Sequence, residues 1–150
     1  MGILNLPEIS PITRKTALGE EIFDPVRKKY ILLTPEEWVR QHWISYLQTH
    51  LHVSASWITV EYGFQLNGLS KRCDILVFDK KGNPLLVVEC KAPHIRLNNE
   101  VFEQISRYNL VLKAPYLIVS NGIKHYALKI DFSTRSTTFL SGIPDYQDML

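Results

Sequence analysis

The sequence predicts an α/β fold in which a mixed β-sheet is flanked by helices. Two segments have the apolar period and the capping residues of helices, and five others are rich in the aliphatic and aromatic residues of strands. Their order is helix, three strands, helix, two strands, which is typical of α/β and α+β domains. Residues 116–120 follow the second helix and are apolar on both faces, as an interior strand after a crossover helix should be.

The length and composition fit one domain over residues 1–150. The chain is 45% apolar and 21% charged, and a domain of this size can hold a core without disulfides or a structural metal. We expect an irregular extension over residues 1–33, because three prolines interrupt it and only residues 30–33 have strand character. A core over residues 34–131 and a C-terminal tail over residues 132–150 complete the expected organisation.

The first helix begins at a recognisable capping sequence. Thr34 suits the N-cap, the proline after it suits the first helical position, and Glu37 completes a capping box. An apolar side continues the helix to about His50. Glu36 lies near the middle of that side, which predicts either an inward-facing glutamate with a function or one stabilised by the helix dipole and by Arg40.

The other elements follow from composition and from turn residues. Residues 80–83 predict a tight turn between two strands, and the second of these strands is apolar enough to be central. Asn98 or Asn99 is suited to cap a second helix, whose apolar residues recur at helical spacing. The expected strands are 57–66, 72–79, 84–91, 116–120 and 126–131, and the expected second helix is 98–113.

Two carboxylates are expected to face each other across the central hairpin. A symmetric turn pairs positions whose numbers sum to 163, which places Asp74 opposite Glu89, and Lys91 projects from the same face as Glu89. Opposed carboxylates favour a divalent cation, and oxygen ligands without a Cys or His cluster favour Mg²⁺ or Mn²⁺ over Zn²⁺. The alternative is a structural ion pair of these three residues at the end of the sheet.

The same register makes the two cysteines, Cys73 and Cys90, neighbours across the strands on the opposite face. We expect them to be reduced and buried, as in a cytoplasmic protein. No segment approaches the length of about 20 apolar residues that a membrane span needs. The net charge of +2 is too small to bind nucleic acid by bulk charge, so any such binding needs a local site.

Taken in order, these residues resemble the PD-(D/E)xK nuclease superfamily, and specifically the N-terminal nuclease domain of type I restriction enzyme R subunits. The resemblance covers about residues 33–131. It includes the segments 34–41 and 120–122 as well as the motif residues. These motif residues are Glu36 in the first helix, Asp74 on a strand, Glu89-Cys90-Lys91 on the next strand, and Gln104 and Tyr108 on the second helix.

The resemblance implies a restriction-endonuclease-like core and metal-dependent hydrolysis of DNA phosphodiester bonds with Mg²⁺ or Mn²⁺ as cofactor. Asp74, Glu89 and the backbone carbonyl of Cys90 would bind the metal. Glu36 would complete this site or bind a second ion. Lys91 would position the attacking water or help to deprotonate it.

DNA is the partner that this resemblance implies. Gln104 and Tyr108 would contact the phosphate or support the site, and the basic residues Lys71 and Arg72 would meet the DNA backbone. A homodimer and a separate targeting partner stay open. Type I R subunits continue into an ATP-driven motor, whereas these residues contain no phosphate-binding G-x-x-x-x-G-K-[ST] motif, so we expect no ATP site.

Two other functions are compatible with the residues. The first is a nucleic-acid-binding or partner-docking module that keeps the fold without turnover. The second is a metal-free hydrolase that uses the two carboxylates as acid and base. The adjacent Lys91 and the absence of a long aromatic segment for a substrate cleft argue against this second alternative.

Overall fold

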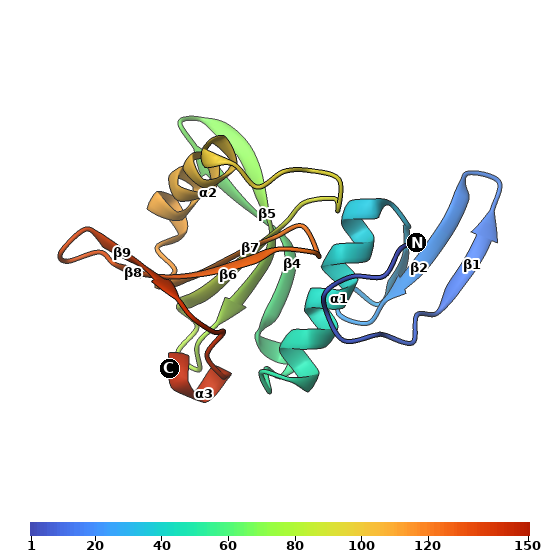
Figure 1. Ribbon diagram of the computed structural model, residues 1–150, viewed down its shortest axis with the longest axis horizontal. Coiled ribbons are helices and arrows are strands. Elements are labelled where there is room, and N and C mark those ends of the chain that lie inside the picture. The colour runs from blue at the N-terminus through green and yellow to red at the C-terminus, as the bar shows by residue number, and fades with distance from the viewer.

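A central six-stranded sheet and a separate three-stranded sheet organise the computed structural model, which describes all 150 residues (Figure 1). Helix α1 lies between the two sheets, and the β8–β9 hairpin projects at the far end of the molecule. The elements are β1 (Thr13–Thr16), β2 (Gly19–Asp24), β3 (Lys29–Leu32), α1 (Pro35–Thr49), a 3-10 turn (Ala55–Trp57), β4 (Ile58–Leu66), β5 (Leu69–Phe78), β6 (Pro84–Cys90), α2 (Asn99–Leu112), β7 (Tyr116–Ser120), β8 (His125–Asp131), β9 (Ser136–Leu140) and α3 (Tyr146–Met149).

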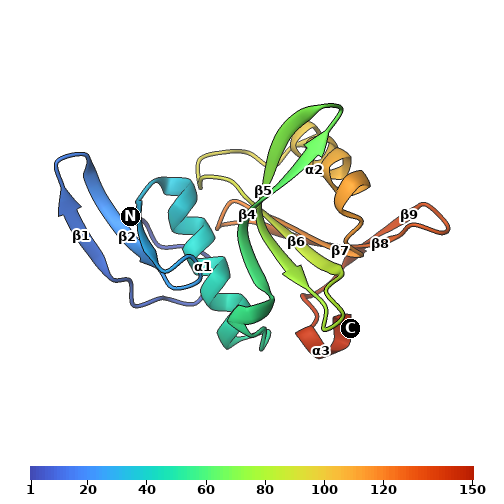
Figure 2. The same ribbon diagram turned by 180° about the vertical axis from the view of Figure 1, so that it is seen from behind.

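The central sheet confirms the predicted mixed α/β architecture. Its strands run in the order β4-β5-β6-β7-β8-β9, and only β6 and β7 are parallel, because α2 carries the chain back between them. The side chains of the sheet divide between two apolar cores. One contains Val39, Trp43 and Leu47 of α1, and the other contains Ile105 and Leu112 of α2, so the two helices cover opposite faces (Figure 2). None of the helices has the length and apolar character required to span a bilayer.

The prediction of an irregular N-terminal extension is wrong. Strands β1, β2 and β3 form an antiparallel sheet on the outer side of α1 (Figure 1). Every residue of β1 is exposed, and β2 buries only Ile22 and Asp24. Composition and alternation therefore carry almost no strand signal here. Ion pairs with α1, described below, fix this sheet in place.

The C-terminal tail contains two elements that were not predicted, a strand and a short helix. Strand β9 pairs with β8, and α3 places Tyr146 and Met149 in the core that α1 covers. The Tyr146 hydroxyl donates a hydrogen bond to the carbonyl of Phe78 at 2.9 Å. All five residues of β9 are polar or lie at least partly in solvent, so a buried-strand pattern is missing.

Helix α1 begins and ends as predicted, but its capping box is only half formed. The Thr34 hydroxyl accepts a hydrogen bond from the Glu37 amide at 3.1 Å, and the helix ends with His50 as C-cap. The Glu37 carboxylate does not return this bond. It is 4% exposed and binds two arginines instead. Glu36 remains 44% exposed, so the more deeply buried glutamate is Glu37 and not the one predicted.

The β5–β6 hairpin reaches the predicted register by a different route. Its loop contains three residues, 80–82, and Gly82 has a φ of 85°. This odd-numbered loop pairs Phe78 with Pro84, and a bulge at Leu85 then restores the predicted register, in which Ile75 pairs with Val88. The two irregularities cancel before the chain reaches Asp74.

Gly122 is a tight contact point between the N-terminal segment and the central domain. Its φ is 84°, and an added Cβ would lie 2.9 Å from Leu4 Cδ2 and 3.0 Å from Val39 Cγ2. Gly122→Ala is therefore expected to lower the free energy of unfolding by about 1–3 kcal/mol, because strain and overpacking act together. Urea denaturation followed by circular dichroism measures this loss.

Substitutions at two other glycines separate the effect of backbone strain from that of overpacking. An added Cβ at Gly82 meets nothing within 4 Å although φ is 85°, so Gly82→Ala reports backbone strain alone. Gly142 has open space and no positive φ, so Gly142→Ala should leave stability unchanged. Equal losses for Gly122→Ala and Gly82→Ala would show that the contact with Leu4 contributes nothing.

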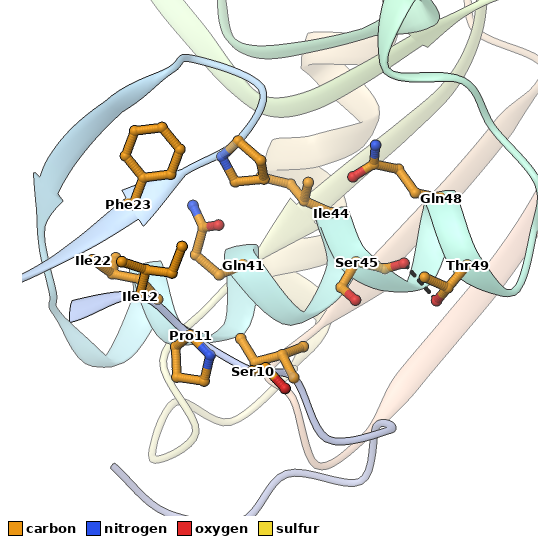
Figure 3. Close-up of a pocket in the computed structure, with 12 residues that line it drawn as sticks. Ser10, Pro11, Ile12, Ile22, Phe23, Gln41, Ile44, Ser45, Gln48 and Thr49 are labelled. Atoms are coloured by element: carbon orange, nitrogen blue, oxygen red, sulfur yellow. Dashed lines mark hydrogen bonds between the residues drawn. The ribbon is translucent and has the colours of Figure 1, made fainter.

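A hollow of about 250 Å³ lies between the N-terminal segment, β2 and α1. Figure 3 shows Ile22 and Phe23 of the sheet on one side of it and Gln41, Ile44 and Ser45 of the helix on the other. None of the predicted metal-binding or substrate-binding side chains lines this hollow. The candidate site therefore lies elsewhere, at the end of the β5–β6 ladder.

Candidate active site

The candidate site begins where the backbone pairing of β5 and β6 stops. The last paired residues are Ile75 and Val88, and beyond them side chains replace backbone carbonyls as hydrogen-bond acceptors. The Asp74 amide donates to Glu89 Oε1 at 3.3 Å, and the Cys90 amide donates to Asp74 Oδ2 at 2.7 Å. The two carboxylates are thus brought together as predicted, each on an amide of the opposite strand.

A break in side-chain alternation turns Asp74 toward α1. Ile75 belongs to the core under α1, whereas Cys73 and Leu76 both belong to the core under α2. The neighbouring strand β4 is distorted at the same level, where Glu61 has a φ of 55°. Such irregularities commonly re-aim a side chain near a functional site.

The prediction that the two cysteines share a face is wrong for the same reason. Cys73 lies in the core under α2 and Cys90 in the core under α1. Both are buried and unpaired. Strict alternation, on which the prediction relied, fails between Asp74 and Ile75.

Arg40 of α1 is the central cation of the site, and its importance was not predicted. Its Nη2 donates to Asp74 Oδ1 at 2.7 Å and to Glu36 Oε1 at 3.4 Å, while Nη1 donates to Glu37 Oε1 at 2.9 Å. The side chain is only 8% exposed. Burial by itself would lower the pKa of Arg40, but the charges of Asp74 and Glu37 raise it above its ordinary value. Arg40 therefore stays charged.

A second buried arginine connects this site to the N-terminal sheet. Arg27, in the turn after β2, donates to Asp24 Oδ2 at 2.6 Å, to Glu37 Oε1 at 2.8 Å and to Glu61 Oε2 at 3.1 Å. Gln41 of α1 also donates to Asp24 and Glu37. Alternating acids and arginines thus form one continuous network from β2 to β5.

Burial and mutual repulsion affect the acids next to Asp74. Burial, and then the Asp74 charge, raise the pKa of Glu89 above its ordinary value. The same two causes, in the same order, raise the pKa of Glu36. The positive charge of Lys91 acts in the opposite direction on both residues. The charge of Asp74 therefore opposes ionisation of both Glu89 and Glu36.

Lys91 stands directly after β6 and has no ion-pair partner within 4 Å. Its backbone is fixed, because its amide donates to the Ser120 carbonyl at 2.8 Å. Its side chain is half-buried. A lysine held at its base with a free ammonium group beside two carboxylates is suited to act on a reactant.

The donor atoms at this site fit Mg²⁺ or Mn²⁺ in chemistry, although no three His, Cys, Asp or Glu side chains are already grouped as a metal cage. Glu89 Oε2 makes no hydrogen bond, and Asp74 Oδ1 accepts only from the Arg40 guanidinium, a side-chain donor. Carboxylate and carbonyl oxygens are the ligands these ions prefer. Asp74 and Glu89 could therefore hold such an ion if Arg40 shifts.

The charges of the network leave a negative surplus. It contains six carboxylates and three cations. The carboxylates are Asp24, Glu36, Glu37, Glu61, Asp74 and Glu89, and the cations are Arg27, Arg40 and Lys91. An excess of negative charge that is partly buried favours a bound cation.

The substrate-binding residues predicted on α2 contact each other rather than the acids. Gln104 Nε2 donates to the Tyr108 hydroxyl at 3.1 Å, and the Tyr108 ring packs against Phe64 of β4 with centroids 5.4 Å apart. No hydrogen bond joins either residue to Asp74 or Glu89. The basic residues at 71 and 72 lie on β5 and form no ion pair within 4 Å.

The fold and the geometry of this site define the class of domain. A mixed sheet between two helices, with two carboxylates and a lysine at the end of the central hairpin, is the restriction-endonuclease-like, nuclease-type architecture. The chain belongs to the family described as type I restriction enzyme R protein N terminus, whose model matches residues 35–144.

Among the solved structures, one supports this fold. A fragment assigned as an HsdR subunit of a type I restriction enzyme from Vibrio vulnificus YJ016 superposes with a TM-score of 0.54 at 23% identity, covering 78% of this chain and 25% of that chain. The chain thus spans about a quarter of that protein. A protein from Anabaena variabilis ATCC 29413, assigned as a nuclease of the DUF820 group, has a TM-score of 0.48 and 14% identity, with coverage of 91% and 88%. A search of the curated proteins finds no match.

Proposed function

We propose that this domain is a metal-dependent endonuclease that hydrolyses DNA phosphodiester bonds. The observation that carries the proposal is the meeting of Asp74 and Glu89 beside the unpaired ammonium of Lys91. Membership of the type I R protein family supports DNA as the substrate. We place its action in the cytoplasm, in association with DNA and with a targeting partner or a second copy of the chain.

Each residue of the site has a distinct role in this proposal. Asp74, Glu89 and the Cys90 carbonyl hold Mg²⁺ or Mn²⁺, with Glu36 at the rim. When bound, such an ion lowers the pKa of a coordinated water and stabilises charge on the phosphate. Lys91 orients the attacking water and offsets negative charge that develops on the phosphate oxygens.

Tyr108 and Gln104 have a supporting role. The Tyr108 ring packs α2 against Phe64 of β4, and the hydrogen bond from Gln104 within the same helix fixes the Tyr108 hydroxyl. Helix α2 lies on the face of the sheet opposite α1. The basic residues Lys71 and Arg72, on the strand that carries Asp74, would contact DNA phosphates without reading the sequence.

The test is a cleavage panel with the purified protein. Duplex, single-stranded and branched DNA, together with RNA, are incubated with Mg²⁺, Mn²⁺ or EDTA. We expect cleavage of a DNA substrate that requires the divalent ion, and its loss in Asp74→Asn. Cleavage that persists in EDTA, or is unchanged in Asp74→Asn, would refute the assignment of this site.

A second candidate function is a module that binds nucleic acid or a partner without turnover. The ion pair between Arg40 and Asp74 favours it, because Arg40 already neutralises one of the two expected metal ligands. Such a module would bind DNA in a filter or mobility assay and leave it intact with either metal ion. Calorimetry with Mn²⁺ in the absence of DNA would then give no binding that depends on Asp74.

A further inference from the structure

We infer that Arg40 is a positioning residue. Its guanidinium occupies the position beside Asp74 that a cation would take, and it releases this carboxylate when a divalent ion binds. The inference rests on the proposed function, because it takes Asp74 and Glu89 as metal ligands. The inference adds that Arg40 competes with the metal ion, because the guanidinium and the divalent cation would bind the same oxygen of Asp74 in turn.

The contacts of Asp74 leave only one oxygen that can change partners. Oδ2 accepts from the Cys90 amide at 2.7 Å, and this donor is fixed in the backbone of β6. Oδ1 accepts from Arg40 Nη2 at 2.7 Å, and this donor lies at the end of a flexible side chain. A cation that binds Asp74 therefore meets Arg40 first.

Arg40 can leave Asp74 without losing all of its partners. Nη1 remains on Glu37 at 2.9 Å and lies 3.7 Å from Glu61, while only Nη2 is bound to Asp74 and Glu36. The network around it carries more acids than cations, so the guanidinium stays among negative charges after it has moved.

The present placement of Arg40 also leaves one of its own donors unpaired. Its Nε is buried and has no hydrogen-bond partner, although the side chain is 8% exposed. A buried donor without an acceptor is costly. A shift of the guanidinium that brings Nε to an acceptor would offset part of the cost of giving up Asp74.

The experiment measures Mn²⁺ binding by calorimetry in the full chain without DNA. Arg40→Met removes the competing charge, and Glu37 keeps Arg27 and Gln41 as partners. We expect its Mn²⁺ dissociation constant to fall at least about tenfold relative to the unaltered protein, which is the effect of one unit charge about 6 Å from a divalent ion even at the dielectric constant of water, about 80. Arg40→Lys keeps the charge and should stay within about threefold of the unaltered protein.

A merely structural Arg40 would give a different result. Its replacement would lower the unfolding midpoint and weaken Mn²⁺ binding or leave it unchanged, and that outcome overturns the inference. Tighter binding in Arg40→Met but not in Arg40→Lys supports it.

A measurement on the unaltered protein covers the case in which Arg40→Met does not fold. Arginine Nε–H signals are followed by NMR during titration with Mg²⁺. The Arg40 signal should shift to saturation, while that of Arg27, which contacts none of the expected metal ligands, should move little. No shift of the Arg40 signal at saturating Mg²⁺ would overturn the inference.

Asp74→Asn distinguishes failure of the inference about Arg40 from failure of the metal site of the proposed function. If the unaltered protein binds Mn²⁺, Asp74→Asn does not, and Arg40→Met is no tighter, the inference alone fails. If neither the unaltered protein nor Arg40→Met binds Mn²⁺ more tightly than Asp74→Asn, the metal site of the proposed function fails and the inference with it.

Discussion

Lys91→Ala is expected to reduce metal-dependent DNA cleavage by at least about a hundredfold, because positioned proton transfer and charge stabilisation each contribute on this scale. The lysine has no ion-pair partner, so its replacement breaks no ion pair of the fold. The measurement is the cleavage rate under single-turnover conditions, together with the free energy of unfolding in urea.

Two further variants test whether the loss of cleavage is specific to the position and the charge of Lys91. Lys80→Ala removes an exposed lysine from the loop at the opposite end of the same hairpin and should cleave at the rate of the unaltered protein. Lys91→Arg keeps a positive charge and should recover part of the activity if charge stabilisation matters. A Lys91→Ala protein that cleaves at full rate would remove this residue from the mechanism.

Arg27→Ala is expected to lower the free energy of unfolding by about 3–5 kcal/mol, the usual cost of breaking a buried ion pair from one side. The arginine is 11% exposed, and its best partner, Asp24, is 0% exposed. Although burial acts to raise it, the hydrogen bonds and charge of Arg27 hold the pKa of Asp24 below its ordinary value. Urea denaturation at neutral pH measures the loss.

A second arginine of the same sheet provides the control. Arg14 pairs with Glu21 at 2.7 Å, but its side chain is 53% exposed. Arg14→Ala should therefore change the stability by no more than about 1 kcal/mol. If the two substitutions had equal effects, the buried network would contribute no more than a surface ion pair.

Much of the fold could be predicted from the sequence where apolar residues recur regularly. Helix α2, strand β7 and the N-cap of α1 occur within a residue or two of their predicted positions, since packing and capping leave a direct pattern in the residue order. Strands β1 and β9 could not be predicted in this way. They bury almost nothing, and pairing with a neighbour is what makes them strands.

The candidate site likewise contains residues that could be predicted from the sequence and others that could not. The register that brings Asp74 and Glu89 together could be predicted from a symmetric turn, although the structure reaches it only because the three-residue loop and the bulge at Leu85 cancel. Arg27 and Glu61 could not be found, because their contacts join segments far apart in the chain and depend on a positive φ at Glu61. Arg40 could be paired with Glu36 from helical spacing, whereas its shorter contact with Asp74 crosses from α1 to β5.

The buried network also determines how this domain could be divided. The segment shared with the family begins at residue 35, yet Arg27, which is paired with Asp24, donates to Glu37 from the preceding sheet, and Leu4 fills the space beside Gly122. A fragment cut at the family boundary would leave Glu37 without Arg27 and would remove Leu4 from the core that α1 covers. The buried network and the core therefore include residues that lie outside the segment matched by the family model.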